Sequence, residues 1–194
     1  MQVMPVTETQ PERKAAPGRL ELVRAFVNSV DYFDEEEDLP DPEALGRWLG
    51  ERGLLNRSHR PSEAEFRRAI DVREGLRSVL LWHNGGELDR QAVERLDRVA
   101  DRASLSVHFS PEPGLQPRSE GVDGALARLL AVVADARADG SWERMKACAH
   151  DPCAWAFYDQ SKNRSKRWCR MDTCGNIEKA RAHRARRGSG QAAS

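Results

Sequence analysis

Four cysteines lie near the end of this 194-residue chain, and they are its residues best suited to bind a metal ion. Their spacing is Cys148-x4-Cys153-x15-Cys169-x4-Cys174, which makes two close pairs joined by a short segment. Zinc prefers four ligands in a tetrahedron, and thiolates at about 2.3 Å satisfy it. We therefore predict one structural zinc ion held by all four cysteines.

Three alternatives to this prediction remain open. A disulfide pair is less favoured, because the N-terminal residues lack the apolar stretch of a secretory signal. A catalytic zinc needs an open coordination position, which four cysteines would close. His150 lies inside the first pair and could replace a cysteine, but we interpret it as a residue beside the site.

The cysteines lie in a basic part of a chain whose formal net charge is zero. Residues 143–187 hold twelve Lys/Arg against five Asp/Glu, a net charge of +7, so the rest of the chain carries −7. Such asymmetry suggests a polyanion-binding end attached to an acidic body, although a solvated basic helix would give the same count.

Short elements are expected around the metal. Residues 154–158 resemble a strand, residues 159–164 a turn, and residues 165–168 a return strand, so we predict a hairpin between the cysteine pairs. Residues 177–187 follow the Gly175-Asn176 turn and resemble a helix. Metal binding would supply much of the folding free energy, of order 10 kcal/mol in small zinc peptides, and Trp155, Phe157 and Trp168 would form a minimal core.

The predicted hairpin turn and helix concentrate side chains that suit a nucleic acid. Lys and Arg neutralise phosphates, Asn and Arg also read base edges, and an aromatic ring can stack on a base, although core packing is the simpler role for Trp168. The predicted contact residues are Lys162, Asn163, Arg164, Lys166, Arg167, Trp168, Asn176, Lys179, Arg181 and Arg184.

The preceding residues have mainly helical periodicity. We expect three helices over residues 20–28, 89–101 and 121–138. A fourth should begin at Pro42, with Asp41 as its N-cap, and a fifth should run from the Ser62–Glu65 capping box to His83. Residues 104–109 alternate as a strand whose partner lies near 115–119. The predicted fold is thus mostly α: a disordered leader (1–19), a helical domain with one small β-hairpin (20–140), a zinc-ribbon-like module of short β-hairpin and helix (141–187), and a disordered tail (188–194).

The helical domain contains no phosphate loop, nucleophile elbow or metalloprotease helix, so we do not expect an enzyme. Arg73 and Glu74 could line a small-molecule pocket, but we interpret them as a surface ion pair or a capped face. We treat His59, His83 and His108 as structural residues.

Several segments together resemble a known family. Residues 148–153 (CAHDPC), 159–169 (DQSKNRSKRWC) and 171–176 (MDTCGN) resemble the bacterial CGNR zinc finger, and residues 22–28 and 42–49 are similar to its N-terminal ABATE domain. The resemblance implies a stress-induced, DNA-binding transcription regulator with the four cysteines as zinc ligands. The fourth residue of the CGNR motif is Arg in the family but Ile177 here, which puts one nucleic-acid contact in doubt.

The favoured function is therefore a cytoplasmic regulator that binds DNA through its zinc finger, while the helical domain senses a small-molecule ligand or forms a homodimer. The alternatives are an RNA-binding protein and a protein-interaction module that binds no nucleic acid. The interaction module predicts that reversing the charges of Arg164 and Arg167 leaves nucleic-acid binding unchanged. No apolar run is long enough for a membrane span.

Overall fold

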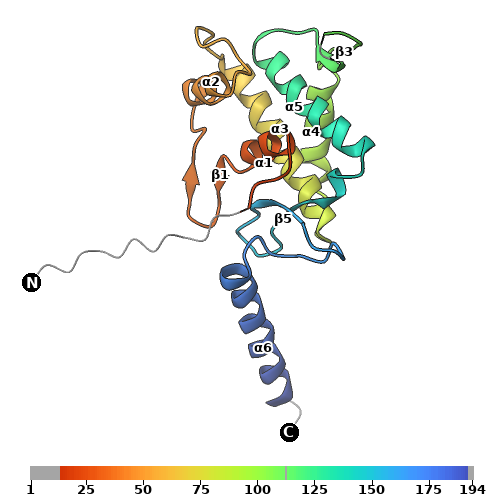
Figure 1. The fold of residues 1–194 in the computed structure, drawn as a ribbon. Helices are drawn as coiled ribbons and strands as arrows, with labels where there is room; N and C mark the ends of the chain where they lie inside the picture. Colours follow the sequence, from red (N-terminus) through yellow and green to blue (C-terminus); the bar gives the residue numbers. More distant parts are fainter. Residues whose placement is uncertain (1–13, 112, 192–194) are drawn as a thin grey trace, which may run out of the picture.

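The computed structural model describes residues 14–111 and 113–191, in which a helical body stands above a small C-terminal module (Figure 1). Residues 1–13 of the predicted leader and residues 192–194 of the predicted tail lie outside the described residues. The helices of the body are α1 (Leu20–Val27), α2 (Pro42–Glu51), α3 (Glu63–His83), α4 (Arg90–Ala100) and α5 (Gly121–Ala138).

The long helix α3 runs through the middle of the body and packs against α1, α2, α4 and α5. Its start is fixed by the predicted capping box: the Glu65 backbone N–H donates to Ser62 Oγ, while the Ser62 N–H donates to the Glu65 carboxylate. Its buried face carries Val72, Leu76 and Leu80, which join Val23 and Phe26 of α1 in one core. The predicted mostly helical fold is confirmed.

Other helix boundaries also follow local signals. Asp41 caps α2 by accepting a hydrogen bond from the Ala44 N–H, with Pro42 in the first turn. Asp89 caps α4 in the same way. The α3 C-cap is Asn84, the first residue of the predicted Asn-Gly-Gly stop.

The body contains two small hairpins, not the one predicted. The expected hairpin is present as β3 (Leu105–His108) and β4 (Gly114–Pro117). The second pairs β1 (Val30–Asp31) with β2 (Glu36–Glu37), inside the segment we had interpreted as an acidic loop. These strands are too short to give a periodic pattern, and the Glu37 side chain that anchors them binds Arg73, far away in the sequence.

The C-terminal module comprises the 3-10 turn η1 (Trp142–Arg144), β5 (Met145–Ala147), β6 (Ala156–Tyr158), the π-turn η2 (Met171–Gly175) and α6 (Asn176–Gln191). The predicted pairing of residues 154–158 with residues 165–168 is wrong. Strand β6 pairs with β5, before the first cysteine, because Met145 and Ala147 pack into the helical core. Asn28, the C-cap of α1, also exchanges two hydrogen bonds with Ala156.

The last helix, α6, leaves the body and runs outward (Figure 1). It begins at Asn176, within a residue of the prediction, and continues to Gln191. No helix in the described ranges is both long and apolar enough to cross a membrane.

Candidate metal centre

The four cysteines converge although they come from different segments. Their Sγ atoms all lie within 4.8 Å of one another, and all four residues are buried. The Sγ of Cys169 is 3.6 Å from that of Cys153 and 3.8 Å from that of Cys174. A tetrahedron with metal–sulfur bonds of about 2.3 Å has sulfur–sulfur edges of about 3.8 Å, so these side chains fit one zinc ion. The cysteines are free thiols, not disulfides.

The backbone holds these sulfurs in place. The Cys169 N–H donates to Cys148 Sγ at 3.4 Å, and the Cys148 N–H donates to the Trp155 carbonyl at 2.9 Å. Phe157 is buried against the cluster, with Trp155 and Trp168 packed around it. Trp168 therefore belongs to the small core around the cysteines, the simpler of its two predicted roles.

Clustering also changes the acidity of the thiols. Hydrogen bonds from Cys153 and Cys169 lower the pKa of Cys148 to about 2. Contact with Cys148 raises the pKa of Cys153 and of Cys169, to about 12 for Cys169, and burial raises the pKa of Cys174 to about 12. Ionisation of one thiol in this cluster thus makes ionisation of the next thiol less favourable. A bound dication removes that opposition, because it stabilises all four thiolates together.

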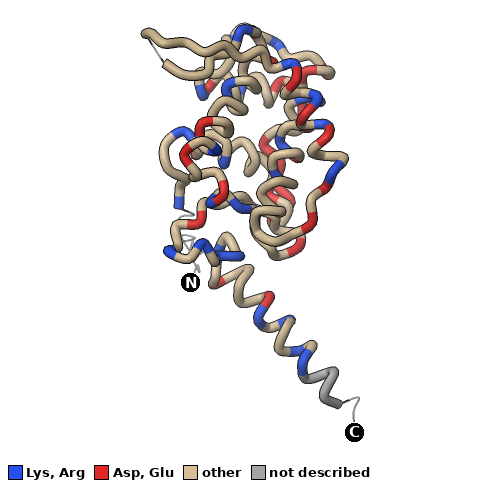
Figure 2. Tube along the Cα trace, turned by 90° about the vertical axis from the view of Figure 1, so that its right-hand side faces the viewer, with Lys and Arg blue, Asp and Glu red and all other residues tan. Residues whose placement is uncertain are grey.

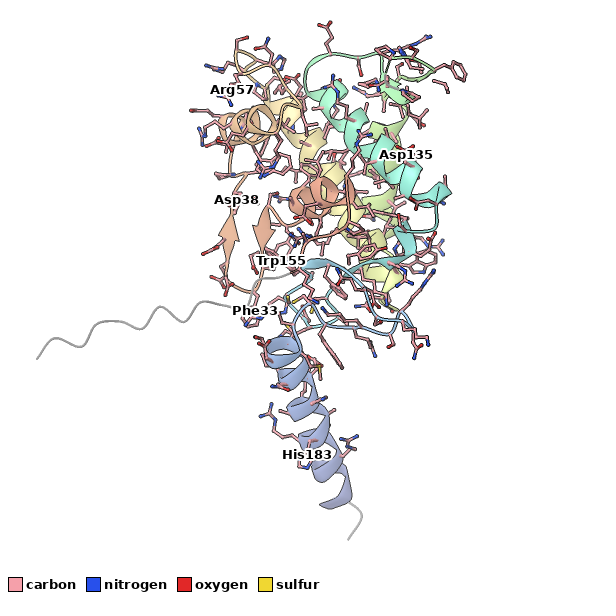
Figure 3. All side chains as sticks on the ribbon, in the orientation of Figure 1. Phe33, Asp38, Arg57, Asp135, Trp155 and His183 are labelled. Atoms are coloured by element: carbon pink, nitrogen blue, oxygen red, sulfur yellow. The ribbon has the colours of Figure 1, made fainter. Side chains whose placement is uncertain are left out.

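His150 lies beside the cluster rather than within the group of four sulfurs. Its Nδ1 is 2.7 Å from the Glu178 carboxylate, and its ring packs against Phe33. Figure 3 shows Phe33 close to the start of α6. Because Glu178 belongs to the first turns of α6, the contact with His150 ties that helix to the loop between the first two cysteines.

A basic loop, residues 161–168, follows β6 and is shaped by a buried ion pair. Lys146 of β5 contacts the Asp159 carboxylate at 2.8 Å, and both side chains are buried. Lys146 Nζ also donates to the backbone carbonyls of Arg164 and Lys166. Asp159 accepts hydrogen bonds from the Lys166 N–H and from Ser161. The loop thus has a defined backbone although its basic side chains face solvent.

The side chains predicted to contact nucleic acid are exposed in both basic segments, apart from the half-buried Trp168. In the described part of the chain, no carboxylate forms an ion pair with six of these bases: Lys162, Arg164, Lys166, Arg167, Lys179 and Arg184. Arg181 lies 3.9 Å from Glu178, and Asn176 donates to the Asp172 carbonyl. Ile177, the departure from the motif, is 39% exposed.

Helix α6 carries basic residues along its described length (Figure 2). Every side chain from Lys179 to Arg186 is exposed, and Figure 3 shows His183 far from the body. The two basic segments lie at the same end of the molecule, with the basic loop at the base of α6 (Figure 1).

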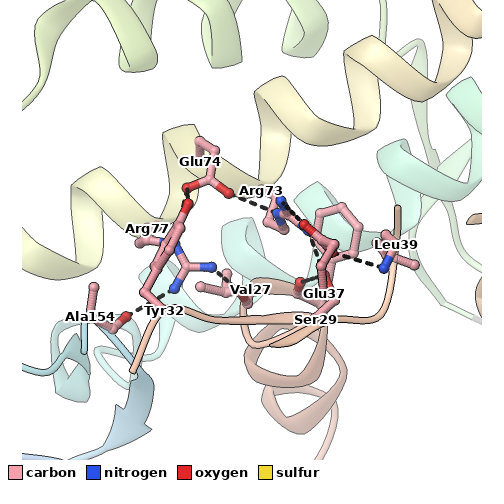
Figure 4. Close-up of polar contacts among 10 residues, drawn as sticks. Val27, Ser29, Tyr32, Glu37, Leu39, Arg73, Glu74, Arg77 and Ala154 are labelled. Atoms are coloured by element: carbon pink, nitrogen blue, oxygen red, sulfur yellow. Dashed lines mark hydrogen bonds and ion pairs between the residues drawn. The ribbon is translucent and has the colours of Figure 1, made fainter. Parts of the chain in front are cut away.

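The predicted ion pair of Arg73 and Glu74 is present (Figure 4), but its predicted surface location is wrong, because the Arg73 side chain is buried. Arg73 pairs with both Glu37 and Glu74 at 2.8 Å, and these partners compensate for the loss of water around the guanidinium. Arg73 Nη1 donates hydrogen bonds to Ser29 Oγ and to the Glu37 carboxylate, so these interactions of the guanidinium are made within the protein.

Sequence reasoning missed several residues that connect the body to the cysteine loops. Arg77 of α3 donates to the Val27 carbonyl and, at 2.9 Å, to the carbonyl of Ala154, next to Cys153. Asn84 donates to the carbonyls of Ala147 and Arg167, both at 2.7 Å. These side chains bond to backbone carbonyls, so no sequence motif could have indicated their partners.

Comparison with protein families gives two matches that together cover most of the chain. A model described as "CGNR zinc finger" matches residues 144–187. The ABATE model, described as "Putative stress-induced transcription regulator", matches residues 20–140. A search of curated proteins gave no match.

Proposed function

Because the chain belongs to the family of ABATE-domain proteins with a C-terminal CGNR zinc finger, we propose that it is a zinc-stabilised regulator that binds DNA. In this proposal the four cysteines hold one zinc ion, and the basic loop and α6 contact the phosphates. The helical body senses a ligand. We propose no catalytic role for the metal, since four thiolates fill a tetrahedral coordination sphere.

One observation carries the proposal: the six exposed bases named above, from two segments at one end of the molecule, form no ion pair with a carboxylate among residues 14–111 and 113–191. Exposed Lys and Arg with no carboxylate partner are free to replace the counterions of a phosphate backbone. The buried Lys146–Asp159 pair supports the same function, because it fixes the backbone of the basic loop before any ligand arrives.

The faces of α6 favour a duplex as the partner. At 100° per residue, Lys179, His183 and Arg186 lie on one side of the helix, and Arg181 and Arg184 on another. A helix that enters a major groove passes between two phosphate backbones, so bases on both flanks suit it. Arg167 of the basic loop would add a contact nearer the body.

Charge reversal tests the proposal. The double variant Arg167→Glu/Arg184→Glu should bind a labelled random-sequence duplex at least tenfold more weakly at about 150 mM salt. The slope of log K against log salt should fall by about 2 in magnitude, since each lost phosphate contact removes about 0.9. Arg164 is left unchanged, because its φ of 50° makes it a poor site for substitution.

The matched control is Arg98→Glu, which reverses an exposed charge on α4. It should leave both the affinity and the slope nearly unchanged. Equal effects of control and double variant, or no duplex binding by the wild type, would refute the proposal. Tighter binding to single-stranded RNA of the same sequence would assign the basic surface to RNA instead.

A further inference from the structure

A groove of about 590 Å³ lies on the helical body, away from the cysteine cluster. Its volume is within the range of about 300–1,000 Å³ that is usual for small-molecule sites. The end of α3 supplies Trp82 and His83, and η1 supplies Trp142. The His83 ring lies 5.7 Å from Trp82 and meets Trp142 edge-on at 5.6 Å. These rings give the groove walls that suit a flat aromatic ligand.

The apolar part of the groove is open to solvent. Trp82 is 56% exposed although it belongs to the central helix, and Leu88 beside it is 37% exposed. Val79 and Val93 extend the same apolar lining. Large apolar side chains gathered in a concave site are typical of ligand-binding surfaces.

His83 also presents a hydrogen-bond acceptor. Its Nδ1 lies 2.9 Å from the Met145 carbonyl, which can only accept, so Nδ1 carries the proton of the neutral ring. Nε2 is then the acceptor nitrogen, and it suits an N–H group of a ligand.

Two opposite charges line the same groove. Arg137 of α5 and Glu143 of η1 both contribute to its wall, and both are exposed. Neither forms an ion pair with the other or with another residue in ranges 14–111 and 113–191. One base and one acid, both unpaired there, complement a ligand that itself carries both charges.

We propose that this groove binds a small aromatic zwitterion, namely an aromatic amino acid or a close analogue. Its ring would pack on the exposed Trp82, since Trp142 is only 3% exposed at the base of the lining. Its carboxylate would contact Arg137 and its ammonium Glu143. The inference deepens the sensing role proposed above and rests on it. The next residue, Arg144, donates to the carbonyls of Asp159 and Ser161 at the start of the basic loop. A ligand that orders η1 therefore acts on a turn directly connected to that loop.

L-tryptophan is the probe, tested on the full 15N-labelled chain by NMR, where unlabelled ligand gives no signal. The indole N–H signals of Trp82 and Trp142, assigned with Phe substitutions, should shift saturably with a Kd of about 0.1–1 mM for a ligand of this size. Tryptamine, which lacks the carboxylate, and indole-3-acetate, which lacks the ammonium, should each bind about two- to fivefold more weakly.

Charge variants separate the two contacts. Arg137→Ala should weaken L-tryptophan and indole-3-acetate about two- to fivefold and leave tryptamine unchanged. Glu143→Gln should weaken L-tryptophan and tryptamine and spare indole-3-acetate. Arg98→Ala, an exposed substitution on α4, should change none of the three affinities.

The absence of saturable shifts up to about 5 mM would overturn the proposal, since this concentration is about fivefold above the weakest Kd expected. Equal effects of Arg137→Ala on all three probes would overturn it as well. Duplex binding without ligand shifts would refute the groove alone. Ligand shifts without duplex binding would refute DNA binding and leave the ligand site standing.

Discussion

Asp159 connects strand β5 of the C-terminal module to the basic loop. Its buried carboxylate accepts hydrogen bonds from Lys146, Ser161 and the Lys166 backbone. Burial raises the pKa of the Asp159 carboxyl, but the hydrogen bonds from Lys146 and Ser161 outweigh burial, so the pKa lies below its usual value. The carboxylate is therefore charged at neutral pH and balances the buried ammonium of Lys146.

Replacing Asp159 by Asn should destabilise the protein by about 3–5 kcal/mol, because the change keeps the side-chain size but leaves Lys146 buried without a counter-charge. Denaturant unfolding at pH 7 measures the effect. Asp97→Asn, on the exposed face of α4, is the matched control and should cost no more than about 0.5 kcal/mol. A loss at Asp159 as small as the control's would show that the pair contributes little.

At this scale the sequence predicts some interactions and not others. The convergence of Cys148, Cys153, Cys169 and Cys174 could be predicted, because zinc chemistry links spacing to geometry. The buried position of Arg73 could not, since its partner Glu37 lies in a segment that reads as a loop. Single charged residues give no sign of burial until their partners are known.

Among the elements, α3 has the best-defined start. The Glu65 carboxylate accepts hydrogen bonds from the Ser62 N–H and hydroxyl and lies 3.2 Å from His59. Partial burial raises the pKa of Glu65, but the bonds from Ser62 and His59 outweigh it and hold the pKa below its usual value.

Removing the cap should cost a moderate amount of stability. Ser62→Ala should lower the free energy of unfolding by about 1 kcal/mol at pH 7.

The depressed pKa of Glu65 means that the contribution of its carboxylate to stability is present above about pH 4.3 and is lost as the pH falls through the folded-state pKa. The stability difference between wild type and Glu65→Gln should therefore shrink on acidification, and a pH-independent difference would contradict the assignment.

Helix α6 differs from the others because its side chains from Lys179 to Arg186 contact little of the body. Isolated helices of this length are marginal in water. We expect its amides to exchange hydrogen for deuterium within seconds, while those of α3 are strongly protected. Duplex DNA should slow exchange in α6 and leave α3 unchanged. Exchange in α6 that does not respond to DNA would remove this helix from the proposed interface.

Element prediction succeeds where the signals are local. The caps at Asp41, Ser62 and Asp89 give the helix starts directly. The pairing of β6 with β5 depends on Asn28, which lies far away in the sequence and exchanges hydrogen bonds with Ala156. A three-residue strand has too little pattern to choose its own partner, so its register follows from tertiary contacts.

On the scale of the whole molecule, the helical body and the C-terminal module share one hydrophobic core. Met145, Ala147 and Ala156 pack in the same cluster as the helices α1, α3 and α5. Arg77 and Asn84 add hydrogen bonds from α3 to the backbone around the cysteines. The two family segments are therefore physically joined, which would give the ligand proposed for the body a route to the basic loop.

This shared core predicts a single cooperative unfolding transition. If zinc occupies the cysteine cluster as proposed, a chelator should lower the midpoint of that transition as a whole, because a ligand that binds only the folded state stabilises it. Differential scanning calorimetry with and without chelator measures it. Two transitions, with the helical one insensitive to the chelator, would show that the parts unfold independently.

The most direct test of the central claim is the metal content of the purified, reduced chain. The four buried sulfurs predict one zinc ion per chain by elemental analysis, and its loss in Cys169→Ser. A zinc content near zero in protein that has met no chelator would contradict the account.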